Sequence, residues 1–69
     1  VRVAREAGVA ALLKQNQAGW KVSLRSRGAV DVGAIAEAHR GGGHHNAAGF
    51  TFDGTREKAI EAVRIGLRG

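Results

Sequence analysis

The residues of this chain best suited to chemistry lie in one segment, residues 41–49, which reads GGGHHNAAG. The three glycines Gly41, Gly42 and Gly43 permit backbone conformations with positive φ and place no Cβ atom between the main chain and an approaching ligand. Consecutive N–H groups in such a segment can converge on an anion, and His44 follows as a donor to a phosphate oxygen. The segment predicts a phosphate-binding loop, although a flexible connection between a helix and a strand would use the same glycines.

Metal binding is a weaker interpretation of the same segment. Adjacent histidines on an extended backbone point in opposite directions, so His44 and His45 rarely bind one metal ion together. His39 shares its predicted helix face with apolar residues, and no acidic cluster completes a set of ligands. We therefore expect no metal site in this chain, and both histidines could also be ordinary surface residues.

A second candidate for phosphate contact is SLRSR, residues 23–27, which combines two hydroxyl and two guanidinium side chains. The guanidinium donors lie in a fixed planar fork that suits phosphate oxygens. Hydroxyl and guanidinium groups at the end of a strand are typical backbone contacts to nucleic acid. An exposed polar strand face would show the same pattern, and it is the favoured interpretation when the segment is considered alone.

The composition agrees with an anionic ligand. Eleven Lys and Arg against six Asp and Glu give the 69-residue chain a formal charge of +5, which is typical of domains that bind polyanions. A solvated basic face, or a genome that favours Arg codons, would give the same balance. The length allows one domain. The absence of cysteine excludes disulfides and thiolate metal sites, and no apolar run approaches the ~20 residues of a membrane span, so we expect a cytoplasmic domain without membrane contact.

The elements that position these segments follow from the apolar pattern. Residues 20–25 alternate, with Trp20, Val22 and Leu24 on one face, and predict a strand that forms a β-hairpin with the apolar residues 9–13. The polar stretch between them, residues 14–19, predicts the turn. The first six residues fit no single pattern.

The second half of the chain predicts helix, strand and helix. Asp31 is a suitable N-cap for a helix over residues 31–39, and Gly41 is a natural stop just past its end. Residues 49–53 predict a third strand, and Thr55 can cap a final helix with an apolar stripe. The order β-β-α-β-α predicts an α+β fold, a small mixed β-sheet with helices packed on one face.

Taken together and in this order, SLRSR and VDVGAIAEAHRGGGHHNAAGF (residues 30–50) resemble the DHH-associated C-terminal domain of DHH-family phosphoesterases. The hallmark of that domain is GGGHxxAAG, and residues 41–49 match it at every fixed position. The domain occurs in bacterial oligoribonucleases that are also 3′-phosphoadenosine 5′-phosphate phosphatases, in 5′ single-strand DNA exonucleases and in exopolyphosphatase-related proteins. A more distant relative forms the C-terminus of alanyl-tRNA synthetases.

The resemblance implies a division of labour between two domains. A larger N-terminal DHH domain would carry the Asp-His-His motif and two divalent metal ions, usually Mn²⁺, that activate a water for attack on a phosphoester. The C-terminal domain would bind the substrate. Carried over to this sequence, the glycines would cradle a phosphate or sugar, and His44 would contact the phosphate near the scissile bond. Arg25 and Ser26 would hold the strand or its terminal phosphate, while His45 and Asn46 occupy variable positions and receive no role.

The sequence departs from the whole family pattern in one respect, since it contains no Asp-His-His triplet and no spaced Asp ligands. We therefore expect residues 1–69 to be a single substrate-binding domain, part of a longer protein, without catalytic residues or a cofactor of its own. The parent protein would be the hydrolase, and the ligand a short single-stranded nucleic acid or a phosphorylated nucleotide. A non-catalytic nucleotide-binding module, or a structural domain with a passive loop, remains the alternative.

Overall fold

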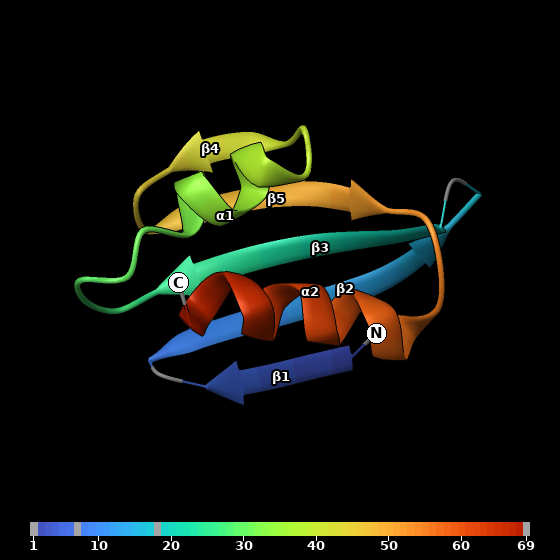
Figure 1. The fold of residues 1–69 in the computed structure, drawn as a ribbon, viewed down its shortest axis with the longest axis horizontal. Coiled ribbons are helices and arrows are strands. Elements are labelled where there is room, and N and C mark those ends of the chain that lie inside the picture. The colour runs from blue at the N-terminus through green and yellow to red at the C-terminus, as the bar shows by residue number, and fades with distance from the viewer. Residues whose placement is uncertain (1, 7, 18, 69) are drawn as a thin grey trace.

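The computed structural model describes residues 2–6, 8–17 and 19–68, with only the backbone described for residues 2–6. Its elements are β1 (Arg2–Glu6), β2 (Val9–Asn16), β3 (Gly19–Ser26), α1 (Val32–Ala38), β4 (Gly42–His44), β5 (Ala47–Phe52) and α2 (Arg56–Arg68) (Figure 1). The strands form one sheet in the order β1-β2-β3-β5-β4. The α+β fold is thus as predicted, but the sheet is antiparallel in every pairing rather than mixed, because three of its four pairings are hairpins.

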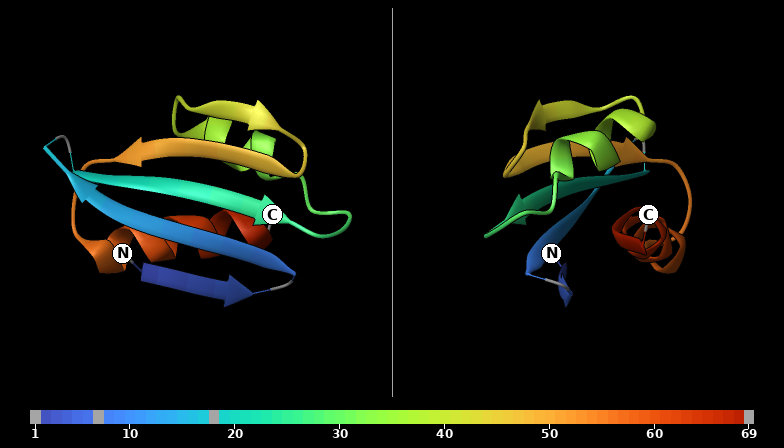
Figure 2. Two further views of the ribbon diagram at one scale, coloured as in Figure 1. Left: turned by 180° about the vertical axis from the view of Figure 1, so that it is seen from behind. Right: turned by 60° about the vertical axis from the view of Figure 1, so that its left-hand side comes forward.

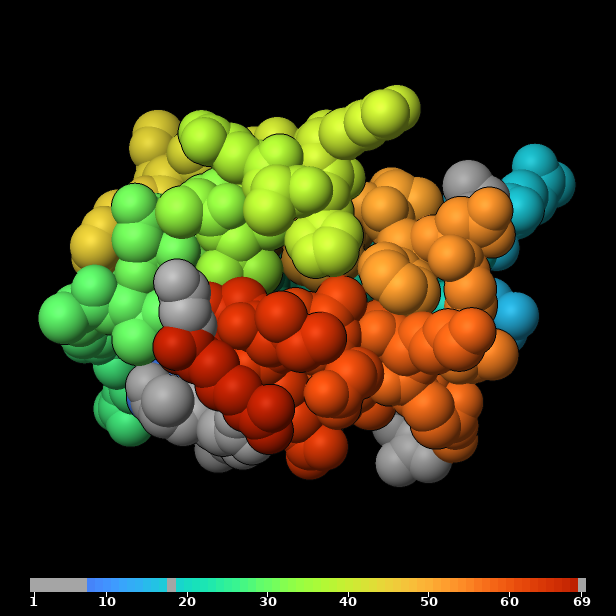
Figure 3. Space-filling model, viewed as in Figure 1, coloured from blue at the N-terminus to red at the C-terminus, as the bar shows by residue number. Residues whose placement is uncertain are grey.

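Both helices lie on the same face of the sheet, so that the strands lie in front of the helices when the molecule is seen from behind (Figure 2). From the other side, the helices and loops hide most of the sheet (Figure 3). Buried side chains of three strands and both helices form the core between the layers: Val9, Ala11, Leu13, Val22, Leu24, Val32, Ile35, Ala36, Phe50, Ala59 and Val63. The opposite face, which no helix covers, is called the open face below.

The hairpin of β2 and β3 is longer than the sequence predicts. Its pairs run from Val9 with Ser26 to Asn16 with Gly19, so most of the predicted turn is strand. The residues of β2 beyond Leu13 are polar because this end of the hairpin is exposed, and their polarity resembles that of a turn. Residues 2–6, for which the sequence predicted no element, form β1 beside β2.

The glycine-histidine segment is a hairpin rather than the predicted loop. Gly42–His44 form β4, His45 and Asn46 form the turn, and β5 begins at Ala47. The sequence hides this strand because glycine is generally depleted in strands. The N-terminus of α1 is fixed to the turn, since the N–H of Val32 donates to the His45 carbonyl at 2.9 Å.

The three glycines of this hairpin meet different surroundings. A Cβ atom at Gly41 would overlap the carbonyl oxygen of Gly49, and one at Gly43 would lie 2.5 Å from that of Ala47. Gly43 also has a φ of 144°, which L residues rarely adopt. A Cβ at Gly42 would meet no atom within 4 Å. The first and third glycines are therefore required by packing, whereas the middle one is not.

Both helices begin at their predicted caps. The Asp31 carboxylate accepts from the N–H of Ala34 at 3.1 Å, and the Thr55 hydroxyl accepts from the N–H of Lys58 at 3.1 Å. These side chains satisfy N–H groups that have no partner within the helix. Among the described residues, neither helix combines the length and the apolar character that crossing a bilayer requires.

The end of α1 differs from the prediction by one residue. Arg40, with a φ of 65°, takes the left-handed position and donates its N–H to the Glu37 carbonyl at 3.0 Å. The N–H of Gly41 donates to the Ala36 carbonyl at 2.8 Å. This pair of hydrogen bonds is the Schellman motif, in which the left-handed residue is usually glycine. Here the arginine adopts that conformation, and Gly41 follows it because β5 leaves no room for a side chain.

We expect Arg40→Gly to raise the free energy of unfolding by about 0.5–1 kcal/mol. Glycine avoids the left-handed cost of about 1–2 kcal/mol, and its greater freedom in the unfolded chain offsets part of that gain. Urea denaturation measures the change. The control Ala38→Gly, two residues earlier at the last position of α1 and without positive φ, should instead destabilise the chain by about 1 kcal/mol. A lower unfolding midpoint for Arg40→Gly would contradict this account of the helix end.

We also expect alanine substitutions at the three glycines of the hairpin to differ in their effect on stability. Gly41→Ala and Gly43→Ala should each lower the free energy of unfolding by about 1–3 kcal/mol, because the added methyl group overpacks the β4–β5 contact. Gly42→Ala should leave it nearly unchanged, since its Cβ meets open space. Thermal unfolding of the three single variants tests this, and equal effects at all three positions would show that close packing is not the reason for the glycines.

Candidate phosphate-binding site

The open face carries three rows of residues that are paired across the strands. Because neighbouring residues of a strand point to opposite faces, paired residues share a face. The arginine row consists of Ala10, Arg25, Ala47 and His44; the middle row of Leu12, Ser23, Gly49 and Gly42; and the lysine row of Lys14, Lys21 and Thr51. Successive rows are about 6.6 Å apart along the strands.

The arginine row brings together the two side chains that the sequence singles out most clearly. Arg25 on β3 and His44 on β4 are both exposed, and only Ala47 of β5 lies between them in the register. Their backbones are therefore about 9.6 Å apart, two strand spacings. Ala47 between them carries only a methyl group, so the Arg25 guanidinium and the His44 imidazole are the polar side chains of this row.

Gly42 adjoins this pair on the open face. It lies two residues before His44 on β4 and opposite Gly49 of β5, so the backbone of both strands is bare there. Of the three glycines predicted to cradle a ligand, Gly42 alone has an empty Cβ position. Gly41 and Gly43 contribute by holding β4 against β5, and direct contact between either of them and a ligand stays a prediction.

Ser26 lies apart from the arginine row. It pairs with Val9, a buried residue, and therefore faces the helix layer. Its hydroxyl accepts from the N–H of Gly28 at 3.3 Å, which stabilises the start of the loop before α1. A ligand contact by Ser26 stays a prediction, and the structure gives this hydroxyl a role in shaping the loop.

Asn46 holds the same loop from the turn of the glycine hairpin. Its side-chain amide donates to the main-chain carbonyls of Ser26 and Gly28, each at 3.3 Å. Its main-chain carbonyl accepts from the N–H of Ser26 at 2.9 Å. Asn46 could not be singled out from the sequence, because the partners of its side chain are 18 and 20 residues away. This residue fixes the position of His44 relative to the end of β3.

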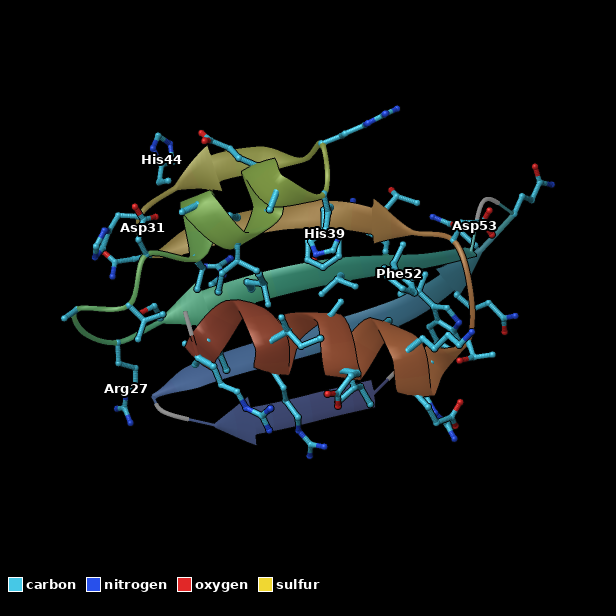
Figure 4. All side chains as sticks on the ribbon, in the orientation of Figure 1. Arg27, Asp31, His39, His44, Phe52 and Asp53 are labelled. Carbon is cyan, nitrogen blue, oxygen red and sulfur yellow. The ribbon has the colours of Figure 1, made fainter. Side chains whose placement is uncertain are left out.

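Arg27 is a candidate that the sequence pattern contained but did not single out. It lines a surface depression beside Arg25, together with Gly8, Val9 and Ala10. Its N–H donates to the Gly8 carbonyl at 3.2 Å and so extends the β2–β3 pairing. Arg27 and His44 lie at the same end of the molecule, away from Phe52 and Asp53 (Figure 4). The spacing of two residues between Arg25 and Arg27 was the available signal, and Arg27 follows directly after the end of β3.

The remaining histidines and the aromatic rings have structural positions. His39 points toward the core, where its ring stacks on Phe50 at a centroid distance of 4.6 Å (Figure 4). Trp20 and Phe52 pack against the same core, so within residues 8–17 and 19–68 no Phe or Trp ring lies on the open face. His45 approaches Asp31, with Nδ1 and Oδ2 3.8 Å apart, but both side chains are half exposed and such a pair contributes little.

Metal ligation finds no support in the part of the chain that the structure describes. No group of three His, Cys, Asp or Glu side chains there lies close enough to hold an ion. The donors of the open face are instead cationic or neutral side chains and bare backbone, a set that suits an anion.

Comparison with known proteins gives the context of this site. The chain is 41% identical, over 93% of its length, to the bifunctional oligoribonuclease and PAP phosphatase NrnA of Thermus thermophilus, and spans about a fifth (21%) of that protein. The crystal structure of an exopolyphosphatase-related protein from Bacteroides fragilis superimposes with a TM-score of 0.77 at 34% identity, over 87% of this chain and 18% of the other. The DHHA1 domain family matches residues 2–65. The chain therefore belongs to the DHHA1 domain family, the domain associated with DHH phosphoesterases.

Proposed function

We propose that the open face binds the substrate of a metal-dependent phosphoesterase, a short oligonucleotide or 3′-phosphoadenosine 5′-phosphate, through one of its phosphates. The observation that carries the proposal is the arginine row, in which Arg25 and His44 flank Ala47 on an uncovered sheet face. Arg25 would supply the charge and a planar pair of donors. His44 would donate a hydrogen bond from the opposite side, and Gly42 would let the ligand approach the backbone.

The surroundings of the row favour binding through phosphate over binding through bases. Proteins that hold single strands without sequence preference usually stack successive bases on aromatic rings. In the part of the chain that the structure describes, the open face offers cations, one imidazole, two hydroxyls, glycines and one exposed leucine instead. Such a face would recognise the charge at the end of a small ligand and would depend little on the identity of its base.

Hydrolysis would require a second domain. The resemblance implies that a DHH domain supplies two divalent metal ions, which would generate the attacking hydroxide and stabilise the charge on the phosphate. Among the described residues of this chain, no group of side chains could bind these metal ions. The residues on the open face would orient the substrate and fix its phosphate against that domain, which is a positioning role that can contribute much of a rate enhancement.

An NMR titration of the 69-residue chain with a 5′-phosphorylated dinucleotide tests the binding site. We expect the backbone amides of Arg25, Gly42, His44 and Ala47 to shift. Arg25→Ala and His44→Ala should each weaken binding about 10- to 100-fold, because a hydrogen bond to a charged group contributes about 1.5–3 kcal/mol.

His45→Ala is the matched control, because it removes the adjacent imidazole from the turn without touching the open face. It should bind the dinucleotide like the parent chain. Equal losses in the His44 and His45 variants, or no amide shifts at millimolar ligand, would refute binding by the arginine row.

A further inference from the structure

The lysine row lies at the opposite end of the open face from the proposed phosphate site and has a feature that packing does not explain. Lys14 of β2 and Lys21 of β3 are directly paired across the strands, and both are exposed. Directly opposed like charges destabilise a sheet. Within the described residues, neither lysine has a carboxylate partner within ion-pair distance. Two unneutralised cations therefore share one patch of surface.

A depression beside Lys21 extends this patch around the edge of the sheet. Its lining combines the cationic side chains of Lys21 and Arg40 and the hydroxyl of Thr51 with Gly41, Gly49 and the stacked rings of His39 and Phe50. The depression exists because β4 pairs only as far as Gly49, so that the outer side of β5 beyond it has no strand among the described residues. Arg40 reaches it from the strained left-handed position that ends α1.

The middle row separates the two cationic rows and carries no charge. Arg25 and Lys21 are four residues apart on β3, so their rows are about 13 Å apart, too far for one phosphate to contact both. Between them lie Ser23, the bare backbone of Gly49 and Leu12, whose side chain is 43% exposed although apolar. At this separation the two cationic rows would hold phosphates that are not neighbours in the strand, and the phosphate between them would lie over Ser23 and Gly49.

We propose that Lys14, Lys21 and Thr51, with Arg40 at the rim, form a second phosphate subsite for an oligonucleotide that lies along β3. The proposal rests on the proposed function, in which the first phosphate is held by Arg25 and His44. The second phosphate would neutralise the opposed lysines, and the intervening nucleotide would cover Leu12 and Ser23. Chains long enough to reach both rows would bind more tightly than a mononucleotide.

The test is a binding series with 5′-phosphorylated oligonucleotides of one to four nucleotides, measured by NMR at two salt concentrations. We expect affinity to rise with length and the amides of Lys21 and Thr51 to shift only with the longer ligands. Lys21→Gln should weaken the tetranucleotide about tenfold, reduce its salt dependence by the share of one phosphate contact, and leave the mononucleotide unchanged. Arg40→Gly should also reduce the gain with length.

The matched control is Lys58→Gln, which removes the same charge from α2 on the other side of the sheet and should not affect the series. The subsite is refuted if affinity does not rise with oligonucleotide length, or if it rises as steeply in the Lys21→Gln variant. It is also refuted if Lys58→Gln lowers the affinity for the tetranucleotide as much as Lys21→Gln does. If inorganic tripolyphosphate shows an equal gain in affinity that depends on Lys21, the patch binds a chain of phosphates, and the proposal of an oligonucleotide ligand is wrong. The proposed function fails separately if Arg25→Ala does not change the affinity for the mononucleotide.

Discussion

The contact between β4 and β5 is the constraint on which the arrangement of the site depends. At Gly41 and Gly43 the two strands are so close that no side chain fits between them. This approach lets the short β4 pair with β5 and puts His44 in register with Arg25. The same hairpin receives the first turn of α1 through its turn carbonyl, so the position of the helix also follows from it. Small residues at these positions therefore serve the geometry of the site without necessarily touching its ligand.

The two faces of the sheet follow different rules. On the helix face, apolar periodicity, capping and burial agree, as expected of a sequence that specifies one fold. On the open face and its rim, the chain places like charges opposite each other at Lys14 and Lys21 and an arginine in a left-handed conformation at Arg40. Departures of this kind cost stability, and they concentrate where a protein meets a ligand. Their position along one surface supports the proposal that this side binds a ligand.

Much of this could be predicted from the sequence because the signals are local. The alternation around Val22 fixed β3 and the faces of its residues, and Asp31 and Thr55 marked the starts of both helices. The prediction of a loop for the glycine-histidine segment was wrong, because β4 can pair with β5 only if Gly41 and Gly43 carry no Cβ atom, and no local pattern shows this. The order of the strands was likewise out of reach, and without it His44 could be placed near Arg25 only through the family resemblance.

The pairing of β3 with β5 has a consequence for how the chain reaches its fold. The other strand pairings join neighbours in sequence, whereas this one joins residues as distant as Trp20 and Phe52. Bringing such distant segments together costs loop entropy before any contact compensates for it, and it slows folding. We expect the β2–β3 hairpin and the unit of α1, β4 and β5 to form first, with their docking as the slow step. The open face, which spans both units, would then be completed last.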